Sequence, residues 1–322
     1  MMRRYNTGFS RAVVVVAAMA VVLAACGGSS SKSSSSGKTT VAFAFVGPLT
    51  GANANLGINS RNGAAVAVKQ ANAAQSKYNF VLKDFDTQGD PAQAPGQAAK
   101  YEADTQILAV VGPTFSGETK AVLPSLSDAG LVMVSPSATN VALPTVVPSG
   151  KVFHRVIPDD DVQAQGVASY IEKKIKPKSV ALINDNSDYG KGLWDGVLKD
   201  LGTAGVPVAV TDAVQPGGTD YSAAVNKVKA ANVDLVFYGG YYSDAGRLKK
   251  QLSDAGVKAG FISGDGSLDP GFIVSSGAAG GEGALITCPC KLATTDAAGD
   301  LGTFAKNYKS QIASLEAEIG KE

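Results

Sequence analysis

The sequence predicts an α/β protein with two doubly wound lobes, each containing a parallel sheet. Short apolar runs of strand length alternate with longer stretches of helical periodicity, which is typical of parallel βαβ units. This alternation runs from about residue 41 to residue 134 and begins again at Val152. The segment Leu143–Lys151, rich in Pro, Val and Gly, separates the two runs. It favours two lobes over the alternative, a single barrel of eight βα units.

The first run contains alternating expected strands and helices. Residues 41–46 are a short apolar run that ends in Gly-Pro, and residues 78–85 alternate in character, so both are expected strands. The Ala-rich stretch 57–75 is an expected helix. Pro91 stands in the first turn of the next expected helix, a position that accepts proline. The remaining elements are strands at 107–111 and 131–134 and helices at 91–105 and 117–129.

The second run repeats the pattern. The expected helix at 160–175 places five apolar residues on one face. Those residues are Ala164, Val167, Ala168, Ile171 and Ile175. Gly256 ends the expected helix at 244–255, because glycine favours the left-handed helix stop. The other helices are expected at 189–204 and 220–231, and the strands at 152–157, 180–183, 206–210, 235–238, 261–263 and 284–287.

The N-terminus has the features of an export signal. Three arginines precede an uninterrupted apolar run, Ala12–Ala25, which is shorter than the roughly 20 residues that span a bilayer. Residues 1–25 are therefore expected to be a signal peptide. The run ends in Leu-Ala-Ala-Cys and resembles the lipobox of bacterial lipoproteins, in which Cys26 is lipidated. The alternative is an ordinary signal peptide with an incidental cysteine. Residues 26–39 are almost all Ser and Gly and are expected to be a flexible tether.

Composition excludes several classes of protein. Without the three arginines of residues 1–25, the chain has 26 basic and 28 acidic residues, a net charge of −2. Nothing in this balance suggests nucleic acid. His154 is the only histidine, and with Cys288 and Cys290 it is too poor a ligand set for structural zinc. Two thiols besides Cys26 do not make a disulfide scaffold, and no metal or cofactor is expected.

Ligands of open α/β sheets bind beyond the carboxyl ends of the strands. The loops at those positions are 112–117 and 135–140 in the first half, and 185–190, 238–242 and 263–266 in the second. They carry Ser116, Ser137, Thr139, Tyr189, Tyr241 and Asp265. Ser116 stands where a helix N-terminus favours an anion. Each of these residues has a structural alternative to ligand binding. Ser116 would only cap the helix, and Ser137, Thr139 and Asp265 would only form turns. Tyr189 and Tyr241 would only pack in the core.

Catalytic templates are missing from the sequence. There is no G-x-S-x-G elbow, no dinucleotide fingerprint and no P-loop. A Ser-His-Asp triad would have to use His154, which falls in an expected strand. An exported hydrolase that uses Ser116 lacks a base. The chain is therefore not expected to be an enzyme.

Residues 41–290 resemble the leucine/isoleucine/valine-binding proteins of ABC importers, whose fold is the type I periplasmic binding protein. The resemblance rests on strings in matching order and spacing. They are GPLTG at 47–51, GINSRNGAAVAV at 57–68, SPSAT at 135–139, NDNSDYGKG at 184–192, YGGYY at 238–242 and SGDG at 263–266. It implies two lobes that close on the ligand by hinge motion. It places residues 40–157 and 289–322 in the first lobe and 158–288 in the second.

The resemblance also implies a role for each candidate residue. Ser116 matches a serine that binds the ligand carboxylate, and Thr139 a threonine that contacts carboxylate and ammonium. Ser137 stands where a backbone carbonyl accepts from the ammonium. Tyr189 and Tyr241 match tyrosines that contact the ligand on closure. Asp265 replaces a glutamate that pairs with the ammonium.

The implied protein is a monomeric solute-binding lipoprotein, anchored to the outer face of the bacterial cell membrane through Cys26. Its partners are a small amino acid, branched-chain or otherwise apolar, and the permease subunits of an ABC transporter. Two alternatives stay open. The ligand is an amide, urea or another small polar solute that does not need Asp265, or the protein is a sensor that reports its ligand to a receptor.

The sequence departs from the family at three places. Leu56 stands where the family often has an aromatic residue against the ligand side chain, which alters the expected pocket shape. Cys288 and Cys290 fall at an expected crossover and have no assigned role. The chain ends at Glu322, before the family's further crossover and final strand, so two alternatives stay open: the C-terminal part of the first lobe is truncated, or the tail diverges from the family.

Overall fold

The computed structural model describes residues 38–148, 151–290 and 299–319. The chain divides into two units, a first unit, Met1–Lys38, and a main unit, Thr39–Glu322. The predicted signal peptide, lipidation site Cys26 and most of the tether lie outside the described residues. Within the described part of the chain, no helix combines the length and apolar character needed to cross a membrane.

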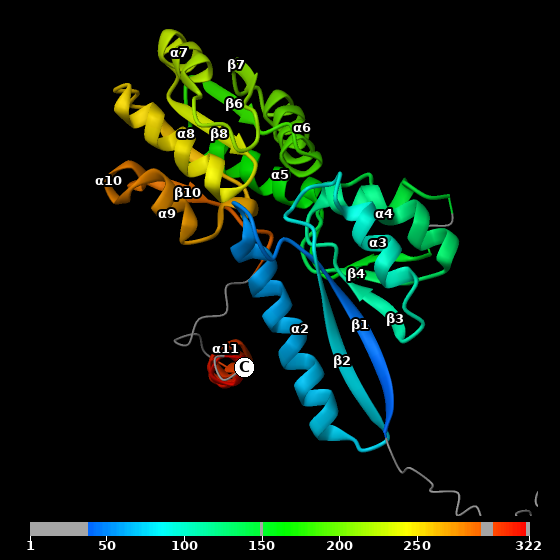
Figure 1. Cartoon of the computed structure of the whole chain (residues 1–322). Coiled ribbons are helices and arrows are strands. Elements are labelled where there is room, and N and C mark those ends of the chain that lie inside the picture. Colours follow the sequence, from blue (N-terminus) through cyan, green and yellow to red (C-terminus); the bar gives the residue numbers. More distant parts are fainter. Residues whose placement is uncertain (1–37, 149–150, 291–298, 320–322) are drawn as a thin grey trace, which may run out of the picture. The chain divides into compact units, whose positions relative to one another are not determined.

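The main unit contains two five-stranded sheets, and every strand pair in them is parallel. The first sheet has the order β2-β1-β3-β4-β5 (Figure 1). Its strands are β1 (Thr39–Gly47), β2 (Tyr78–Asp86), β3 (Ile107–Val111), β4 (Met133–Ser135) and β5 (Phe153–Arg155). Its helices are α2 (Ala54–Ala74), α3 (Ala94–Glu102), α4 (Ser116–Ala129) and the 3₁₀ turn η1 (Leu143–Thr145).

The second sheet has the order β10-β9-β8-β6-β7. Its strands are β6 (Val180–Asn184), β7 (Val208–Ala213), β8 (Leu235–Gly239), β9 (Gly260–Ser263) and β10 (Ala284–Ile286). Four longer helices accompany them: α5 (Asp160–Tyr170), α6 (Asp188–Thr203), α7 (Ser222–Ala231) and α8 (Tyr242–Asp254). The short elements are the π turn η2 (Ile171–Ile175), the 3₁₀ turn η3 (Asp265–Ser267), α9 (Gly271–Ser276) and α10 (Ala278–Gly281).

Both sheets reverse strand order beside their first strand. β1 lies between β2 and β3, and β6 lies between β7 and β8. Such a switch point leaves a crevice beyond the carboxyl ends of the strands. The loops after β3, β6 and β8 begin at these two points, so the topology positions their side chains for a ligand site.

The second sheet is covered on both faces, as a doubly wound sheet requires. Alternate residues of β6 and β8 enter two different cores because successive side chains point to opposite faces. Ala181 and Ile183 pack in one core with α7 and α8, whereas Val180 and Leu182 pack in the other with α5 and α6.

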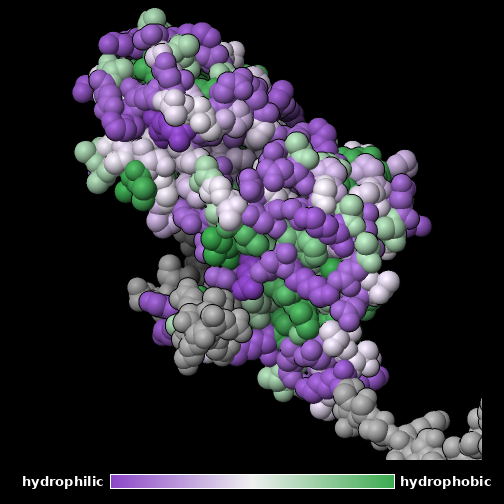
Figure 2. Space-filling view, in the orientation of Figure 1, coloured by the Kyte–Doolittle hydropathy of each residue, from purple (hydrophilic) through white to green (hydrophobic). Residues whose placement is uncertain are grey.

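The first sheet is covered less evenly. Its main core includes Ala42, Ala44 and Val46 of β1 together with residues of α3 and α4. Its opposite face has an apolar hollow of about 380 Å3 beside α2. The hollow is lined by Phe43, Ala64, Ala67, Val68, Ala71, Phe80, Leu82 and Val111. Figure 2 shows hydrophobic side chains gathered over β1 and β2.

The predicted fold class is confirmed, and the barrel alternative is wrong because two separate sheets form. The expected helix at 91–105 is shorter, Ala94–Glu102. Pro91 precedes it, because Asp90 Oδ1 accepts from the Ala92 N–H at 2.8 Å and holds a turn there. The expected helix at 160–175 ends in a π turn, closed by the Lys176 N–H that donates to Ile171 O at 2.8 Å.

The helix α11 (Gly299–Ile319) contacts the first-sheet helix α2. Gln70 Nε2 donates to Gln311 Oε1 at 2.6 Å, and Lys69 Nζ donates to Ser314 Oγ at 3.3 Å. The chain therefore returns from the second sheet to the first one after β10.

Candidate functional site

The residues singled out from the sequence converge on one cavity. Its volume is about 190 Å3, below the roughly 300–1,000 Å3 of pockets for drug-sized ligands. Six of its wall residues were predicted: Leu56, Ser116, Ser137, Tyr189, Tyr241 and Asp265. Asn59, Ser60, Phe115 and Gly266 also line it. Thr139 is fully buried and does not reach the cavity surface. The cavity suits a small solute, and the binding role of each residue stays a prediction.

Ser116 contributes a helix N-terminus to the cavity. It is the first residue of α4, and its Oγ accepts from the Asn140 N–H at 3.2 Å. The helix is capped differently, since Glu118 Oε2 accepts from the Phe115 N–H at 2.8 Å. The alternative in which Ser116 serves only as the cap is therefore wrong. The first N–H groups of a helix lack partners within the helix and carry its positive dipole end, so an anion is favoured beside Ser116.

Ser137 and Thr139 follow β4. The Ser137 hydroxyl donates to Thr114 O at 2.6 Å, so its side chain is already occupied. The Thr139 backbone O accepts from the Asp160 N–H at 3.0 Å and from Arg155 Nη1 at 3.1 Å. The Thr139 Oγ1 is buried without a hydrogen-bond partner. This loop therefore places one buried hydroxyl beside Asp160.

Tyr189 and Asp265 form a polar pair on the second-sheet side. The Tyr189 hydroxyl donates to Asp265 Oδ1 at 2.9 Å and accepts from the Gly266 N–H at 2.9 Å. The ring lies so close to the loop that a Cβ on Gly266 would approach Tyr189 Cε1 to 2.6 Å, which explains the glycine. Burial raises the pKa of Asp265. A carboxylate in this position suits a cationic group.

Tyr241 stacks on Phe115 across the cavity. The ring centroids lie 4.1 Å apart with an interplanar angle of 29°, and the Tyr189 ring is 5.1 Å from Tyr241. Phe115 comes from the loop after β3, whereas Tyr241 precedes α8. The stack thus joins elements of the two sheets and makes an apolar wall of the cavity.

The same stack separates the cavity from a second one of about 410 Å3. Its walls include the carboxyl groups of Asp90, Glu118, Asp185, Asp188 and Asp244. Burial raises the pKa of Glu118 to about 7 and that of Asp185 to about 6. The acidic groups of this second cavity disfavour an anion there.

Several contacts hold elements of the two sheets together around the cavity. Asp188 receives two of them: its backbone O accepts from Asn140 Nδ2 at 2.6 Å, and its Oδ1 pairs with Lys120 Nζ at 2.6 Å. Asn55 Nδ2 also donates to Asp269 Oδ1 at 2.9 Å. These contacts join first-sheet and second-sheet elements that carry the walls of the cavity.

Sequence reasoning missed part of the site. Asn59 and Ser60 lie three and four positions after Leu56 on α2, and this helical spacing could have indicated them. Asp160 and Gln163 are buried near the cavity at the start of α5. Their signal was weak, because acidic residues are common in the first turn of any helix.

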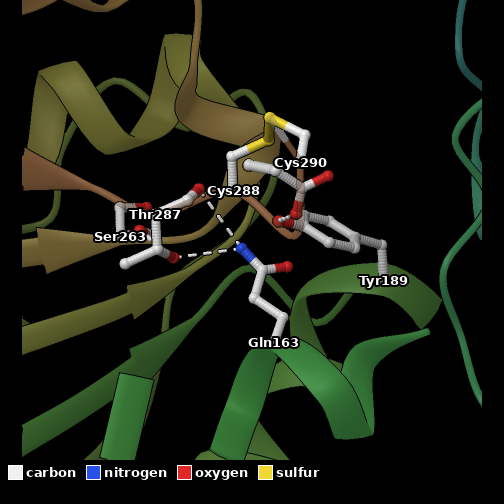
Figure 3. The surroundings of a disulfide bond; sticks show 7 residues. Gln163, Tyr189, Ser263, Thr287, Cys288 and Cys290 are labelled. Atoms are coloured by element: carbon white, nitrogen blue, oxygen red, sulfur yellow. Dashed lines mark hydrogen bonds between the residues drawn. A yellow bond between two sulfur atoms is a disulfide. The ribbon is translucent and has the colours of Figure 1, made fainter. Parts of the chain in front are cut away.

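Cys288 and Cys290, to which the sequence assigned no role, form a disulfide with a Cα–Cα distance of 5.1 Å. It lies directly after β10, close to Gln163 and Tyr189 (Figure 3). Gln163 Nε2 donates to Thr287 Oγ1 at 3.0 Å, which in turn donates to Ser263 O at 3.0 Å. The disulfide therefore closes a short loop in the segment after β10. The hydrogen bond from Gln163 to Thr287 holds this segment beside the site. In the described ranges, no cluster of three His, Cys, Asp or Glu could hold a metal.

Comparisons with known proteins agree with this architecture. A model of the periplasmic binding protein family matches residues 40–318. The Leu/Ile/Val-binding protein BraC3 of Rhizobium johnstonii is 37% identical over 245 residues, which cover 75% of this chain and 66% of that protein. The leucine-, isoleucine-, valine-, threonine- and alanine-binding protein of Pseudomonas aeruginosa is 33% identical over 253 residues, covering 78% of this chain and 66% of that protein. The chain therefore spans about two thirds of the length of these relatives.

Solved structures share the fold. The branched-chain amino acid transporter substrate-binding protein LivJ of Streptococcus pneumoniae, in complex with isoleucine, gives a TM-score of 0.77 at 25% identity, covering 85% of this chain and 77% of that one. The leucine-binding protein LivK of Thermotoga maritima gives a TM-score of 0.75 at 25% identity, covering 84% of this chain and 76% of that one.

Proposed function

Because the chain belongs to the periplasmic binding proteins, a family that binds solutes and does not transform them, we propose that it binds a small apolar amino acid for an ABC importer. Branched-chain amino acids are the first candidates, since relatives carry them in their names and LivJ was solved with isoleucine. The family places the protein outside the cytoplasm.

One observation carries the proposal: the cavity has a site for an anion at one side and a carboxylate at the other. Ser116 opens α4, and Asp265 stands opposite with its pKa raised by burial. An α-amino acid carries both charges on neighbouring atoms, and burying either is costly unless it is paired and hydrogen-bonded. The stack of Phe115 on Tyr241 gives the apolar side chain a wall.

Closure of the lobes is part of the proposal. Residues 40–157 and 289–322 would form one lobe and residues 158–288 the other, with the crossing segments as the hinge. The hydrogen bonds between α2 and α11 support the assignment of the C-terminal residues. A ligand bridging Ser116 and Asp265 has both charges satisfied only in the closed state, so binding would favour closure.

Titration calorimetry of the chain from Gly37 onward tests the ligand class. We expect saturable binding of leucine, isoleucine or valine and none of urea or simple amides. Binding of amides alone would contradict the proposal. Trp194 on α6, the only tryptophan, offers a fluorescence signal for closure, because it lies beside Gly239 near the site.

The membrane anchor is tested separately. We propose that Cys26 carries a lipid, so Cys26→Ser should move the protein from the membrane fraction to the soluble fraction. Retention of this variant in the membrane fraction would contradict the lipid anchor. It would not bear on the proposal that the protein binds an amino acid. Light scattering after size exclusion should give the mass of a monomer.

A further inference from the structure

Buried polar atoms without partners gather at the start of α5. They are Thr139 Oγ1, both carboxyl oxygens of Asp160, and Gln163 Oε1. The three residues are only 0%, 1% and 4% exposed, respectively. Buried polar groups are normally paired, and each unpaired one costs about 1–3 kcal/mol. Three of the four atoms only accept while Asp160 is ionised, and the Thr139 hydroxyl beside Asp160 is the one donor among them, so the group is short of donors.

No cation satisfies Asp160 within the described residues. The charge of Arg155 acts on Asp160, but the Nη2 of Arg155 donates to Asp159 Oδ2 at 3.1 Å. Its Nη1 donates to the carbonyls of Thr139 and Asn140 at 3.1 and 2.9 Å. On the other side α6 packs closely, since a Cβ on Gly192 would lie 3.0 Å from Asp160 Oδ2. A buried carboxyl with no paired cation is favoured in its neutral form.

The groups that face Asp160 from the surrounding elements act on its neutral form in both directions. Burial raises the pKa of Asp160 to about 7, and the negative charges of Asp265 on η3 and Asp159 add to the effect. The nearby Thr139 hydroxyl and the charge of Arg155 oppose it. Tyr189 on α6 stays protonated, because burial raises its pKa well above the usual value.

We propose that Asp160 is a second acidic group of the ligand site, protonated in the empty protein and ionised when a ligand ammonium pairs with the charge of Asp265 beside it. This inference rests on the proposed function. The O–H bond of Asp160 breaks, its electron pair stays on the carboxylate, and the proton passes to the solvent. No bond of the ligand changes. The bound ammonium then faces Asp265 in the cavity wall, with the charge of Asp160 buried behind that wall, which would disfavour ligands without a cationic group.

Ionisation of Asp160 on binding makes the ligand affinity depend on pH, and the direction of this dependence follows from the proton released. Below pH 7 the empty protein holds the proton, and the bound protein holds it less tightly. Binding therefore releases protons in this range, and affinity rises with pH until it levels off above about pH 7. By linkage, one full proton released corresponds to a tenfold gain in affinity per pH unit.

Calorimetry with leucine measures the proton directly. Titrations at pH 6 in two buffers of different ionisation enthalpy give the number of protons released from the difference in observed enthalpy. We expect between half a proton and one proton for the wild type, falling to near zero at pH 8. Asp160→Asn should still bind leucine but lose the buffer dependence. Asp161→Asn, the same change at the exposed neighbour, should keep it.

A wild-type enthalpy at pH 6 that does not depend on the buffer would overturn the proposal, whatever the variants do. Buffer dependence that persists in Asp160→Asn would assign the proton to another group, such as Asp265, and overturn the role of Asp160. A folded wild type that binds no amino acid at pH 8 would instead refute the proposed function itself.

Discussion

The two sides of the cavity are built differently. The first-sheet side presents a helix start and hydroxyl groups, and its Ser116 and Ser137 side chains already hold hydrogen bonds to neighbouring backbone. The second-sheet side presents an ionisable group, Asp265, held by the Tyr189 hydroxyl. The first side is thus preorganised by backbone geometry for an anion, whereas the second supplies charge that needs a counterion. Ligand affinity should therefore depend most on the second side.

Removing the charge of the second side should have the largest effect. Asp265→Ala should weaken leucine binding by about 2–5 kcal/mol, because it leaves a buried ammonium without its partner. Calorimetry would measure the change, with 4-methylpentanoate, which lacks the ammonium, as the matched ligand. A loss below about 0.5 kcal/mol for leucine, or an equal loss for both ligands, would refute the pairing of Asp265 with the ammonium.

The first side should contribute less. Ser116→Ala removes a hydroxyl that we expect to bind the ligand carboxylate, and hydrogen bonds to charged groups contribute about 1.5–3 kcal/mol. The backbone N–H groups of α4 remain, so binding should be weakened and not abolished. Ser125→Ala on the same helix is the control, since its Oγ donates to Val122 O. Unchanged leucine affinity in Ser116→Ala would remove the anion site from this helix start.

The wall that both sides share should matter for apolar ligands. Phe115→Leu breaks the stack with Tyr241, and an aromatic pair contributes about 0.5–1.5 kcal/mol beyond its buried area. We expect a loss of this size in leucine affinity. Phe85→Leu breaks the edge-on pair with Tyr101 in the first-sheet core, so it should lower the free energy of unfolding and leave affinity unchanged. The reverse pattern would show that Phe115 acts only in packing.

The surface contact between the sides should have the smallest effect. Lys120→Ala removes the ion pair with Asp188, in which Lys120 is 57% exposed, and exposed pairs contribute about 0.2–1 kcal/mol. The loss in leucine affinity should shrink as salt is added. Lys191→Ala removes a pair with Asp195 inside α6 alone and should not alter binding. An effect above about 2 kcal/mol, beyond the range of an exposed pair, would mean that Lys120 contacts the ligand.

Periodicity predicted the fold well because each strand and helix follows local rules. Short apolar runs indicated β6 and β8. The junctions between strands and helices, together with the resemblance to the solute-binding family, indicated Ser116, Tyr241 and Asp265, which line the cavity. Helix limits were less predictable, since the turn held by Asp90 depends on one side-chain hydrogen bond.

Tertiary packing set the rest of the site. Asp160 has an ordinary place in a run of three aspartates, and only the approach of α6 and the Arg155 contacts make it buried and unpaired. Thr139 lies below the cavity surface for the same reason. The pairing of Cys288 with Cys290 could not be read from spacing alone, because the same thiols could stay free.

The disulfide after β10 closes a very short loop, and this bears on how the protein can be produced. Loop-closure entropy grows with loop length, so the bond between residues two apart removes little freedom from the unfolded chain. The chain-entropy relation gives about 1–2 kcal/mol for such a loop. A chain made in a reducing cytosol should therefore still fold, and the bond should close afterwards in air without reshuffling of other pairs.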